Sequence, residues 1–188
     1  TWSDADRRRW FDAYVRLLVP PLCNVFFQEG VFSEPHLQNV VVGLEGGWPV
    51  RIYLRDLDNC KVVDNGPAAE HLAALDPSTR EELSLPRDVA WPRFLYCLFV
   101  NHLLEAAAAL ADGDTLREIA LWSHVRTVLD EQTTNVPSAW RSEWDRLRFG
   151  APLPAKGNLI TRFRKGKDRE APFVALPSPL RFVRERER

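Results

Sequence analysis

The chain has 188 residues, with 25 Lys and Arg against 26 Asp and Glu, so its formal net charge is −1. A hydrophobic fraction of 45% excludes a disordered or fibrous chain, and the balanced charge argues against a dedicated nucleic-acid binder, which usually carries a basic excess. No purely apolar run approaches the roughly 20 residues that cross a bilayer, and no charged-then-apolar leader opens the chain. We expect one cytoplasmic domain with no membrane or nucleic-acid partner.

Cysteine and methionine usage adds two expectations. Cys23, Cys60 and Cys97 lie far apart without CxxC spacing, which predicts neither a disulfide framework nor a zinc or iron–sulfur site and fits a reducing cytosol. The chain contains no Met and begins at Thr1, so we expect it to be a domain cut from a longer protein.

The first 30 residues predict two helices. Ser3 is a plausible N-cap with Asp6 three residues on, and apolar residues then repeat at helical spacing. Pro20-Pro21 predicts the end of this helix and the start of a second, because proline is tolerated in a first turn but not inside a helix. Gly30 predicts the end of the second helix.

A β-hairpin is predicted next. Residues 39–44 are apolar and β-branched, Glu45-Gly46-Gly47 forms a turn, and residues 50–56 alternate between apolar and polar. The period of two continues the apolar face to Asp56, so its carboxylate is predicted to point inward. A buried carboxylate needs a cation or hydrogen-bond donors.

The remaining chain is predicted to be mostly helical. The expected helices span about 77–83, with Asp76 as its N-cap, and 91–110, 116–129 and 138–147. An extended stretch over 155–163 and a Pro-rich run to Leu180 follow, and residues 181–188 form a charged tail. The predicted fold class is α+β, a mostly helical domain with a small antiparallel hairpin. His71, His102 and His124 lie on helical patterns and are predicted to be ordinary core or surface histidines.

Polar side chains gather at the open end of the predicted hairpin. The antiparallel return places Asn39, at the start of the first strand, beside Asp56, at the end of the second. Amide and carboxylate oxygens suit Mg²⁺, which is usually completed by waters and substrate phosphates. His36 and Arg55 can donate hydrogen bonds to a phosphate, and Glu34 can add a metal ligand. The pattern predicts a magnesium–nucleotide phosphate site similar to a kinase-like metal loop; the alternative is a polar turn beside an Arg–Asp ion pair.

Several motifs together resemble a known family. Glu34-Pro-His36-Leu-Gln38-Asn39, Leu54-Arg55-Asp56, Leu98-Phe-Val-Asn101-His102-Leu and Lys156-Gly-Asn158-Leu-Ile-Thr-Arg162 are similar to the C-terminal palm region of the NRPS-independent siderophore synthetases, the IucA/IucC family. The likeness runs from about Trp10 to Pro179, with Pro35 where the family pattern has Ala. It implies a palm domain over 1–180, followed by the charged tail 181–188, as part of a larger cupped-hand fold.

The resemblance also implies a reaction and a set of site residues. Family members use ATP and Mg²⁺ to adenylate a carboxylate of citrate or a related polycarboxylic acid, release pyrophosphate, and let an amine, hydroxylamine or alcohol attack. The implied catalytic residues are His36 and Arg55. The implied ATP contacts are Glu34, His36, Gln38, Asn39, Arg55 and Asp56, the implied Mg²⁺ ligands are Glu34, Asn39 and Asp56, and the implied polycarboxylate contacts are Lys156, Asn158 and Arg162.

The family's nucleotide also contacts a preceding "fingers" region that this chain lacks. We therefore expect the fragment alone to be inactive and the full-length protein to be a homodimer. Three other functions stay open. A small-molecule kinase of the aminoglycoside or choline type would release ADP, and a non-catalytic binding or assembly domain would show no Mg²⁺-dependent nucleotide affinity. A ferric-siderophore reductase of the FhuF type needs an iron–sulfur cluster, against which the lack of clustered cysteines after Cys97 argues.

Overall fold

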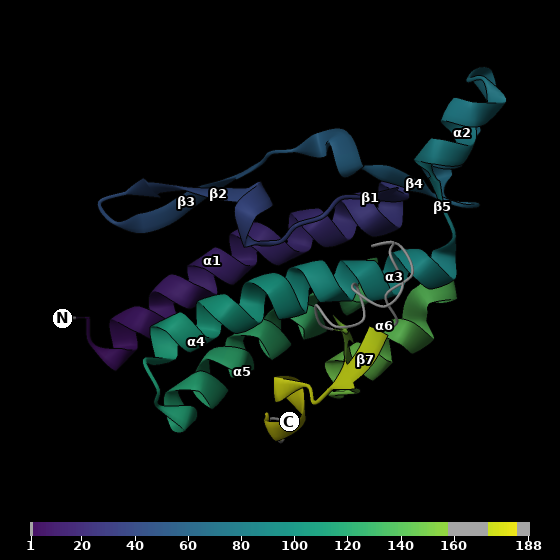
Figure 1. Ribbon diagram of the computed structural model, residues 1–188. Helices are drawn as coiled ribbons and strands as arrows, with labels where there is room; N and C mark the ends of the chain where they lie inside the picture. The colour runs from purple at the N-terminus through teal and green to yellow at the C-terminus, as the bar shows by residue number, and fades with distance from the viewer. Residues whose placement is uncertain (1, 158–172, 184–188) are drawn as a thin grey trace.

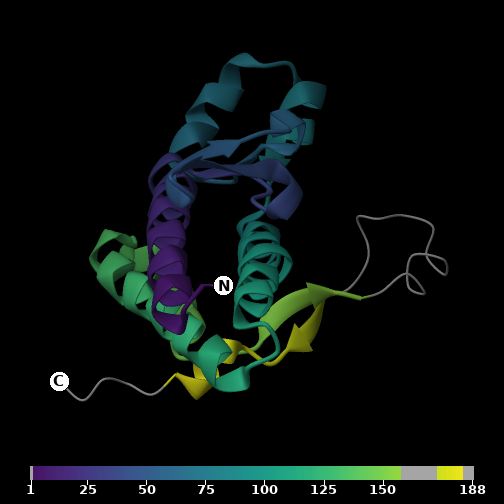
Figure 2. The same ribbon diagram turned by 90° about the vertical axis from the view of Figure 1, so that its left-hand side faces the viewer.

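Three long helices form the body of the protein, and a β-hairpin lies along one of them (Figures 1 and 2). The computed structural model describes residues 2–157 and 173–183. The helices are α1 (Asp4–Asn24), the continuous helix 87–111, and α5 (Thr115–Gln132). Helix 87–111 consists of α3 (Arg87–Leu95), a π-helical segment (Tyr96–Leu104) and α4 (Glu105–Ala111). Helix α1 packs against α5, and α4 packs against α5. The mostly helical α+β fold class is confirmed.

Helix α1 begins with the predicted capping box. Ser3 Oγ accepts a hydrogen bond from the Asp6 backbone N–H at 3.1 Å, and the Asp6 carboxylate accepts one from the Ser3 backbone N–H at 3.2 Å. A π-helical turn, Val25–Glu29, extends the helix, and Gly30 with a φ of 70° ends it as predicted.

The predicted break at Pro20-Pro21 is wrong, because α1 continues through both prolines. Leu18, Leu22 and Cys23 on either side of the pair are buried in the core. Packing of this apolar face holds the helix together across the pair, although two backbone donors are missing there.

The predicted hairpin is present as β2 (Val40–Glu45) and β3 (Trp48–Leu54). Val40 pairs with Leu54, and Gly46 and Gly47 form the two-residue turn with φ values of 57° and 86°. Positive φ at both turn positions is what a tight hairpin turn requires, and glycine adopts it without strain. Contacts between β3 and α1 hold the hairpin against the helical layer.

Two smaller sheets contain the other strands of the described residues. One has the order β1-β4-β5, from β1 (Val31–Phe32), β4 (Lys61–Val63) and β5 (Ser84–Leu85). The other pairs β6 (Leu153–Lys156) with β7 (Phe173–Leu176) in antiparallel register. Helix α2 (Pro77–Leu83) lies between β4 and β5 in sequence and begins as predicted, because the Asp76 carboxylate accepts hydrogen bonds from two backbone N–H groups.

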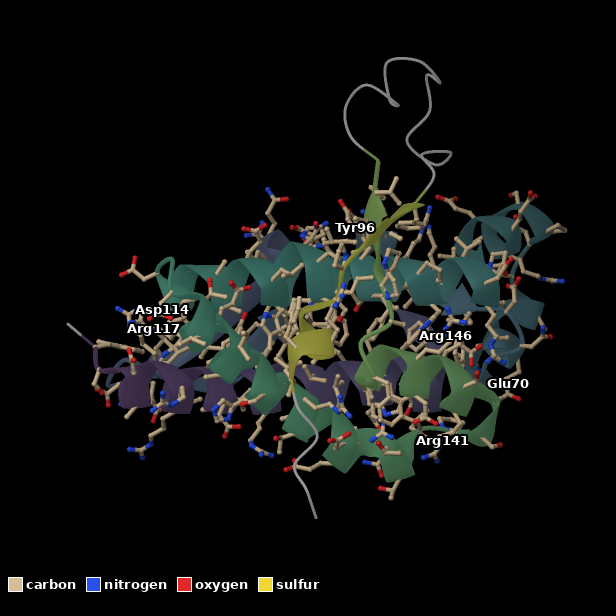
Figure 3. All side chains as sticks on the ribbon, turned by 90° about the horizontal axis from the view of Figure 1, so that it is seen from below. Glu70, Tyr96, Asp114, Arg117, Arg141 and Arg146 are labelled. Atoms are coloured by element: carbon tan, nitrogen blue, oxygen red, sulfur yellow. The ribbon has the colours of Figure 1, made fainter. Side chains whose placement is uncertain are left out.

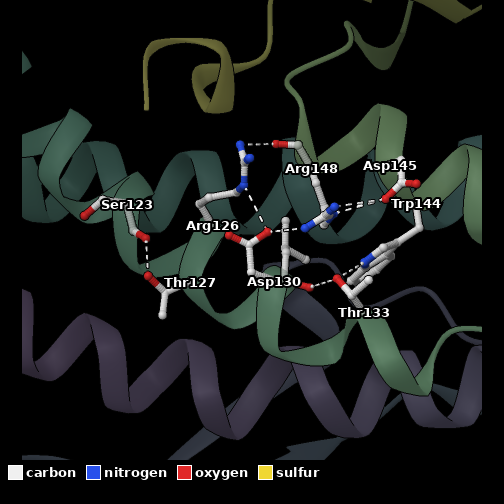
Figure 4. Close-up of polar contacts among 9 residues, drawn as sticks. Ser123, Arg126, Thr127, Asp130, Thr133, Trp144, Asp145 and Arg148 are labelled. Carbon is white, nitrogen blue, oxygen red and sulfur yellow. Dashed lines mark hydrogen bonds and ion pairs between the residues drawn. The ribbon is translucent and has the colours of Figure 1, made fainter. Parts of the chain in front are cut away.

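A polar network joins α5 to helix α6 (Arg141–Arg148) (Figure 4). Asp130 on α5 forms ion pairs with Arg126 and with Arg148, and Arg148 also pairs with Asp145 at 3.1 Å. Trp144 Nε1 donates a hydrogen bond to Thr133 Oγ1 at 3.2 Å. Helix α6 ends at Arg148, so this network fixes the point from which the chain enters strand β6.

The hydrophobic core lies between the helices. Its largest fully buried side chains include Phe11, Phe26, Phe94, Leu98, Leu103, Trp122 and Trp144. Helix 87–111 contains an 18-residue window with a mean hydropathy of 1.6, so its length and composition alone would allow it to cross a membrane. Half of that window is buried among other elements, and core helices of globular proteins carry the same signal. We therefore assign this helix to the core.

Candidate functional site

A pocket of about 500 Å³ lies where the loop before the hairpin, the π-helical segment and strand β6 meet. Its lining combines cationic, carboxylate and amide side chains from three distant parts of the sequence. The lining residues are Glu34, His36, Leu37, Gln38, Tyr96, Cys97, Asn101, Glu105 and Lys156. Four of the predicted site residues, Glu34, His36, Gln38 and Lys156, are thus brought together.

Backbone and side-chain hydrogen bonds stabilise the loop formed by residues 34–39. The Glu34 carbonyl oxygen accepts from the His36 backbone N–H at 2.9 Å and from Asn39 Nδ2 at 3.0 Å. The His36 carbonyl oxygen accepts from the Asn39 backbone N–H at 2.9 Å. Pro35 and Asn39 are buried, while Glu34 and His36 are partly exposed at the pocket. The turn therefore buries its structural residues and presents its chemically useful ones.

Lys156 reaches the pocket from the last residue of strand β6. Its register partner is Phe173 on β7, and the Lys156 Nζ lies 5.6 Å from the centroid of the Tyr96 ring. The Tyr96 and Phe173 rings are also in contact, with centroids 5.9 Å apart. Figure 3 shows Tyr96 beside the β6–β7 hairpin. An ammonium group beside an aromatic ring gains cation–π attraction, which fixes the Lys156 side chain near the pocket.

Asn39, Arg55 and Asp56 do not line this pocket. The Asn39 carbonyl oxygen accepts a hydrogen bond from the Arg55 backbone N–H at 2.9 Å, so the residue beside Asn39 is Arg55, one position before the predicted Asp56. The prediction that the Asp56 carboxylate points inward is wrong. The Asp56 side chain is 56% exposed and forms an ion pair with Arg55 at 3.1 Å.

The reason lies in the backbone after β3. The strand ends at Leu54, and Asp56 has a φ of 56°, in the left-handed region. The alternation of strand side chains stops at that turn, so the period of two does not extend to Asp56. The predicted roles of Arg55 and Asp56 at ATP and Mg²⁺ stay predictions. Asn158 and Arg162 lie outside the described residues.

Besides Leu37 in the same loop, the structure adds four pocket residues to the predicted set. Tyr96, Cys97, Asn101 and Glu105 lie on or beside the π-helical segment. Their spacing of four or five residues is a signal that the sequence carries, because such residues share a helix face. A long π-helical stretch is rare and is often found at functional sites.

The thiol of Cys97 is a neutral part of the lining. Burial, reinforced by the nearby Glu34 carboxylate, raises the pKa of Cys97 to about 12. Burial and the same carboxylate also raise the pKa of Cys60. Both thiols therefore stay protonated near neutral pH and are poor nucleophiles.

The donor set of the pocket fits a magnesium–nucleotide complex. Glu34 and Glu105 supply carboxylate oxygens, Gln38 and Asn101 supply amide oxygens, and Lys156 supplies a cation. Over residues 2–157 and 173–183, no three His, Cys, Asp or Glu side chains form a cage for a metal ion. Mg²⁺ does not need such a cage, since it usually keeps several waters and binds through one or two carboxylates and the substrate phosphates.

A larger groove, about 690 Å³, lies between α3, α6 and the β6–β7 hairpin. Its lining is mainly apolar, with Glu143 and Arg146 as its charged residues, and Glu143 is already paired with Arg87 at 2.9 Å. Fewer groups that bind anions or metals converge there, so we place the functional site in the smaller pocket.

Comparisons with family models, curated proteins and solved structures all point to the same family. Residues 8–171 match the family described as ferric iron reductase FhuF-like transporter. Among curated proteins, the chain is 31% identical to a spermidine-citrate ligase of Bacillus anthracis and 42% identical to an N(2)-citryl-N(6)-acetyl-N(6)-hydroxylysine synthase of Vibrio mimicus. Each alignment covers 94% of this chain and 30% of the relative. The chain thus spans about a third of the length of these curated relatives.

Solved structures share the fold. The ATP-bound aerobactin synthetase IucA of Klebsiella pneumoniae superposes with a TM-score of 0.77 and 25% identity, over 94% of this chain and 30% of that one. The petrobactin biosynthesis protein AsbB of Bacillus anthracis superposes with a TM-score of 0.71 over 92% of this chain and 31% of that one. These matches confirm the resemblance noted in the sequence. The chain belongs to the FhuF-like family, in the form that makes up the C-terminal region of the NRPS-independent siderophore synthetases.

Proposed function

We propose that this chain forms the C-terminal half of the active site of an ATP-dependent siderophore-biosynthesis ligase. The observation that carries the proposal is the meeting of Lys156 with Glu34 and His36 in one pocket, although more than 100 residues separate them in sequence. The relatives named as citrate ligases and synthases supply the substrate class, a citrate-like polycarboxylate. The related structure with bound ATP supports the nucleotide.

The reaction we propose is adenylation followed by acyl transfer. A carboxylate oxygen of the acid attacks the α-phosphorus of ATP, the bond from that phosphorus to the pyrophosphate oxygen breaks, and pyrophosphate leaves. An amine, hydroxylamine or alcohol then attacks the acyl carbon, loses a proton, and expels AMP. Two anions meet in the first step, so donors and cations must offset the developing charge.

The pocket residues have complementary roles in this proposal. His36 donates to the α-phosphate oxygens as negative charge builds there. Glu34 would hold Mg²⁺ in the nucleotide complex, and the bound ion would supply charge withdrawal from the phosphoryl oxygens. Lys156 binds a carboxylate of the acid and brings it toward the phosphorus. Gln38 and Asn101 donate or accept hydrogen bonds at the edges of the bound substrates.

The chain covers about a third of its relatives, which supports the expectation that it is inactive alone and needs the remaining part of the protein. The protonated, unpaired thiols Cys23, Cys60 and Cys97 support the proposal of a cytoplasmic location, since structural disulfides are rare in the reducing cytosol.

The test is product analysis on the intact protein. With ATP, Mg²⁺, citrate and a panel of amines, hydroxylamines and alcohols, we expect AMP and pyrophosphate in equal amounts and an amide or ester of the acid. Formation of ADP and phosphate would favour the kinase instead. Absence of Mg²⁺-dependent ATP binding in a direct titration would favour a non-catalytic assembly domain. In either case the proposal would be wrong.

A further inference from the structure

A buried histidine connects helix α1 to the loop that carries His36. His102 lies in the π-helical segment and is 0% exposed. Its Nδ1 is 2.8 Å from the carbonyl oxygen of Pro35, and its Nε2 forms a short hydrogen bond with the Tyr14 hydroxyl on α1. Pro35 stands between Glu34 and His36, two of the pocket residues.

The partners fix which ring nitrogen carries the proton. A carbonyl oxygen only accepts, so Nδ1 of His102 must donate to Pro35. A neutral imidazole then has Nε2 as an acceptor, and the Tyr14 hydroxyl must donate to it. The result is a directed chain of hydrogen bonds, from the Tyr14 O–H to Nε2 and from Nδ1–H to the Pro35 carbonyl.

This chain links the middle of the loop directly to the helical layer, whereas the end of the loop is tied to strand β3 by the hydrogen bond from the Arg55 backbone N–H to the Asn39 carbonyl oxygen. In the described part of the protein, the other hydrogen bonds to the carbonyl groups of Glu34 and His36 come from within residues 34–39. Those bonds shape the turn but do not place it. The bond from His102 to Pro35 joins the turn to the π-helical segment, in which the preceding residue, Asn101, lines the pocket.

We infer that His102, supported by Tyr14, is a positioning residue that sets where the Glu34–Asn39 loop places His36 and Glu34 over the pocket. The catalytic consequence of this inference rests on the proposed function, whereas its structural part does not. An orienting partner of this kind typically changes activity by about 10- to 100-fold when it is removed, and a displacement of about 1 Å at a reacting group has a similar effect.

Two isosteric substitutions test the hydrogen bonds of the two imidazole nitrogens separately. In His102→Asn the side-chain amide N–H lies near the former Nδ1 and can still donate to Pro35. In His102→Gln the amide lies near the former Nε2 and reaches toward Tyr14 instead. His102→Ala removes both contacts, and Tyr14→Phe removes only the hydroxyl. Leu103→Ala, at the neighbouring fully buried position, is the matched control for general loosening of the core.

The first measurements need no catalysis. Histidine ¹⁵N spectra of the intact protein should show His102 neutral and protonated at Nδ1. Hydrogen exchange at the backbone amides of His36 and Asn39 should be at least about 10-fold faster in His102→Ala and His102→Gln than in wild type, and near wild type in His102→Asn and Leu103→Ala. A proton on Nε2, or equal exchange in the Asn and Gln variants, would overturn the inference.

The activity measurement adds the catalytic consequence. At equal concentrations of folded protein, kcat/KM for ATP should fall about 10- to 100-fold in His102→Ala and His102→Gln and recover most of that loss in His102→Asn. Equal losses in the Asn and Gln variants would contradict the positioning role. Absence of pyrophosphate release by the wild type itself would overturn the proposed function, while the spectra and the exchange rates would still decide the structural inference.

Discussion

The carbonyl oxygen of Asn39 accepts a hydrogen bond from the backbone N–H of Arg55 at 2.9 Å, which closes the open end of the β2–β3 hairpin. The two side chains beside this bond lie in different surroundings. Asn39 is 6% exposed and donates to the Glu34 carbonyl oxygen, whereas the Arg55 side chain is 60% exposed and pairs with Asp56. The side chain of Asn39 therefore stabilises the pocket loop, whereas the side chain of Arg55 faces solvent.

Substitution of Asp56 by Asn should leave the free energy of unfolding within about 0.5 kcal/mol of wild type. An exposed ion pair contributes little, and Asn tolerates the left-handed backbone found at Asp56. Urea titration of the intact protein measures the change. The same variant tests the predicted metal role, because loss of a ligand should raise the Mg²⁺ concentration required for half-maximal pyrophosphate release. An unchanged Mg²⁺ requirement would remove Asp56 from the metal site.

His36→Ala should reduce pyrophosphate release by at least about 100-fold, which is typical for loss of one donor to a developing anion. His36 is partly exposed and lies outside the hydrophobic core, so the thermal unfolding midpoint should change by little. Rates close to wild type at saturating ATP would show that the imidazole has no part in the reaction.

Lys156→Ala should raise the KM for the polycarboxylate about 10-fold or more and change the KM for ATP much less, because we assign its ammonium group to the acid. Initial rates with each substrate varied in turn measure the two constants. Lys156→Arg, which keeps the cation, is the matched variant and should retain part of the affinity. A larger effect on ATP than on the acid would place this lysine at the phosphates.

Protein stability should fall as the pH drops below about 6.5. Burial lowers the pKa of His102 from its ordinary value of 6.5, so the folded protein keeps the imidazole neutral while the unfolded chain takes up a proton. The unfolded state then binds more protons, and the free energy of unfolding decreases by up to about 1.4 kcal/mol per pH unit.

Urea titrations at pH 7.5, 6.5 and 5.5 measure this slope, and His102→Asn should flatten it. Asp6, Asp76 and Asp114 also have lowered pKa values, but hydrogen bonds at helix N-termini are their main cause, and these groups lose their contribution at and below about pH 3.8. Comparison with the variant separates His102 from the other three histidines. An identical slope in both proteins would show that His102 is not the titrating group.

Local signals allowed much of the fold to be predicted. The cap at Asp76, the left-handed residue at Gly30 and the double-glycine hairpin turn each depend on a few adjacent residues, and all three are confirmed. The errors arose where a distant contact or an abrupt turn decides the structure. Packing of the core carries α1 through Pro20-Pro21, and a left-handed residue ends the strand alternation before Asp56.

The site was only partly accessible from sequence. The grouping of Glu34, His36 and Gln38 follows from their proximity in the chain, but the approach of Lys156 came from the family resemblance and not from any local pattern. Asn101 and Glu105 share a helix face in the sequence pattern, but only the tertiary structure shows that this face meets the loop of His36. The helical pattern around His102 predicts a core histidine. It is buried, and its partners become visible only when α1 and the loop are brought together.

Because Tyr96–Leu104 is π-helical, the geometry of the pocket depends on the number of residues in this stretch as well as on their side chains. Each residue added to or removed from a helix rotates everything after it by about 100° relative to everything before it. Deleting one residue from this stretch would let the backbone return to ordinary α-helical winding without breaking the helix. Tyr96 would keep its place, but the side chain of Glu105 would turn away from Lys156. A single-codon deletion here is thus expected to abolish activity and to disturb the packing of the buried residues that follow, such as Ala107 and Ala111, while leaving the helical content almost unchanged.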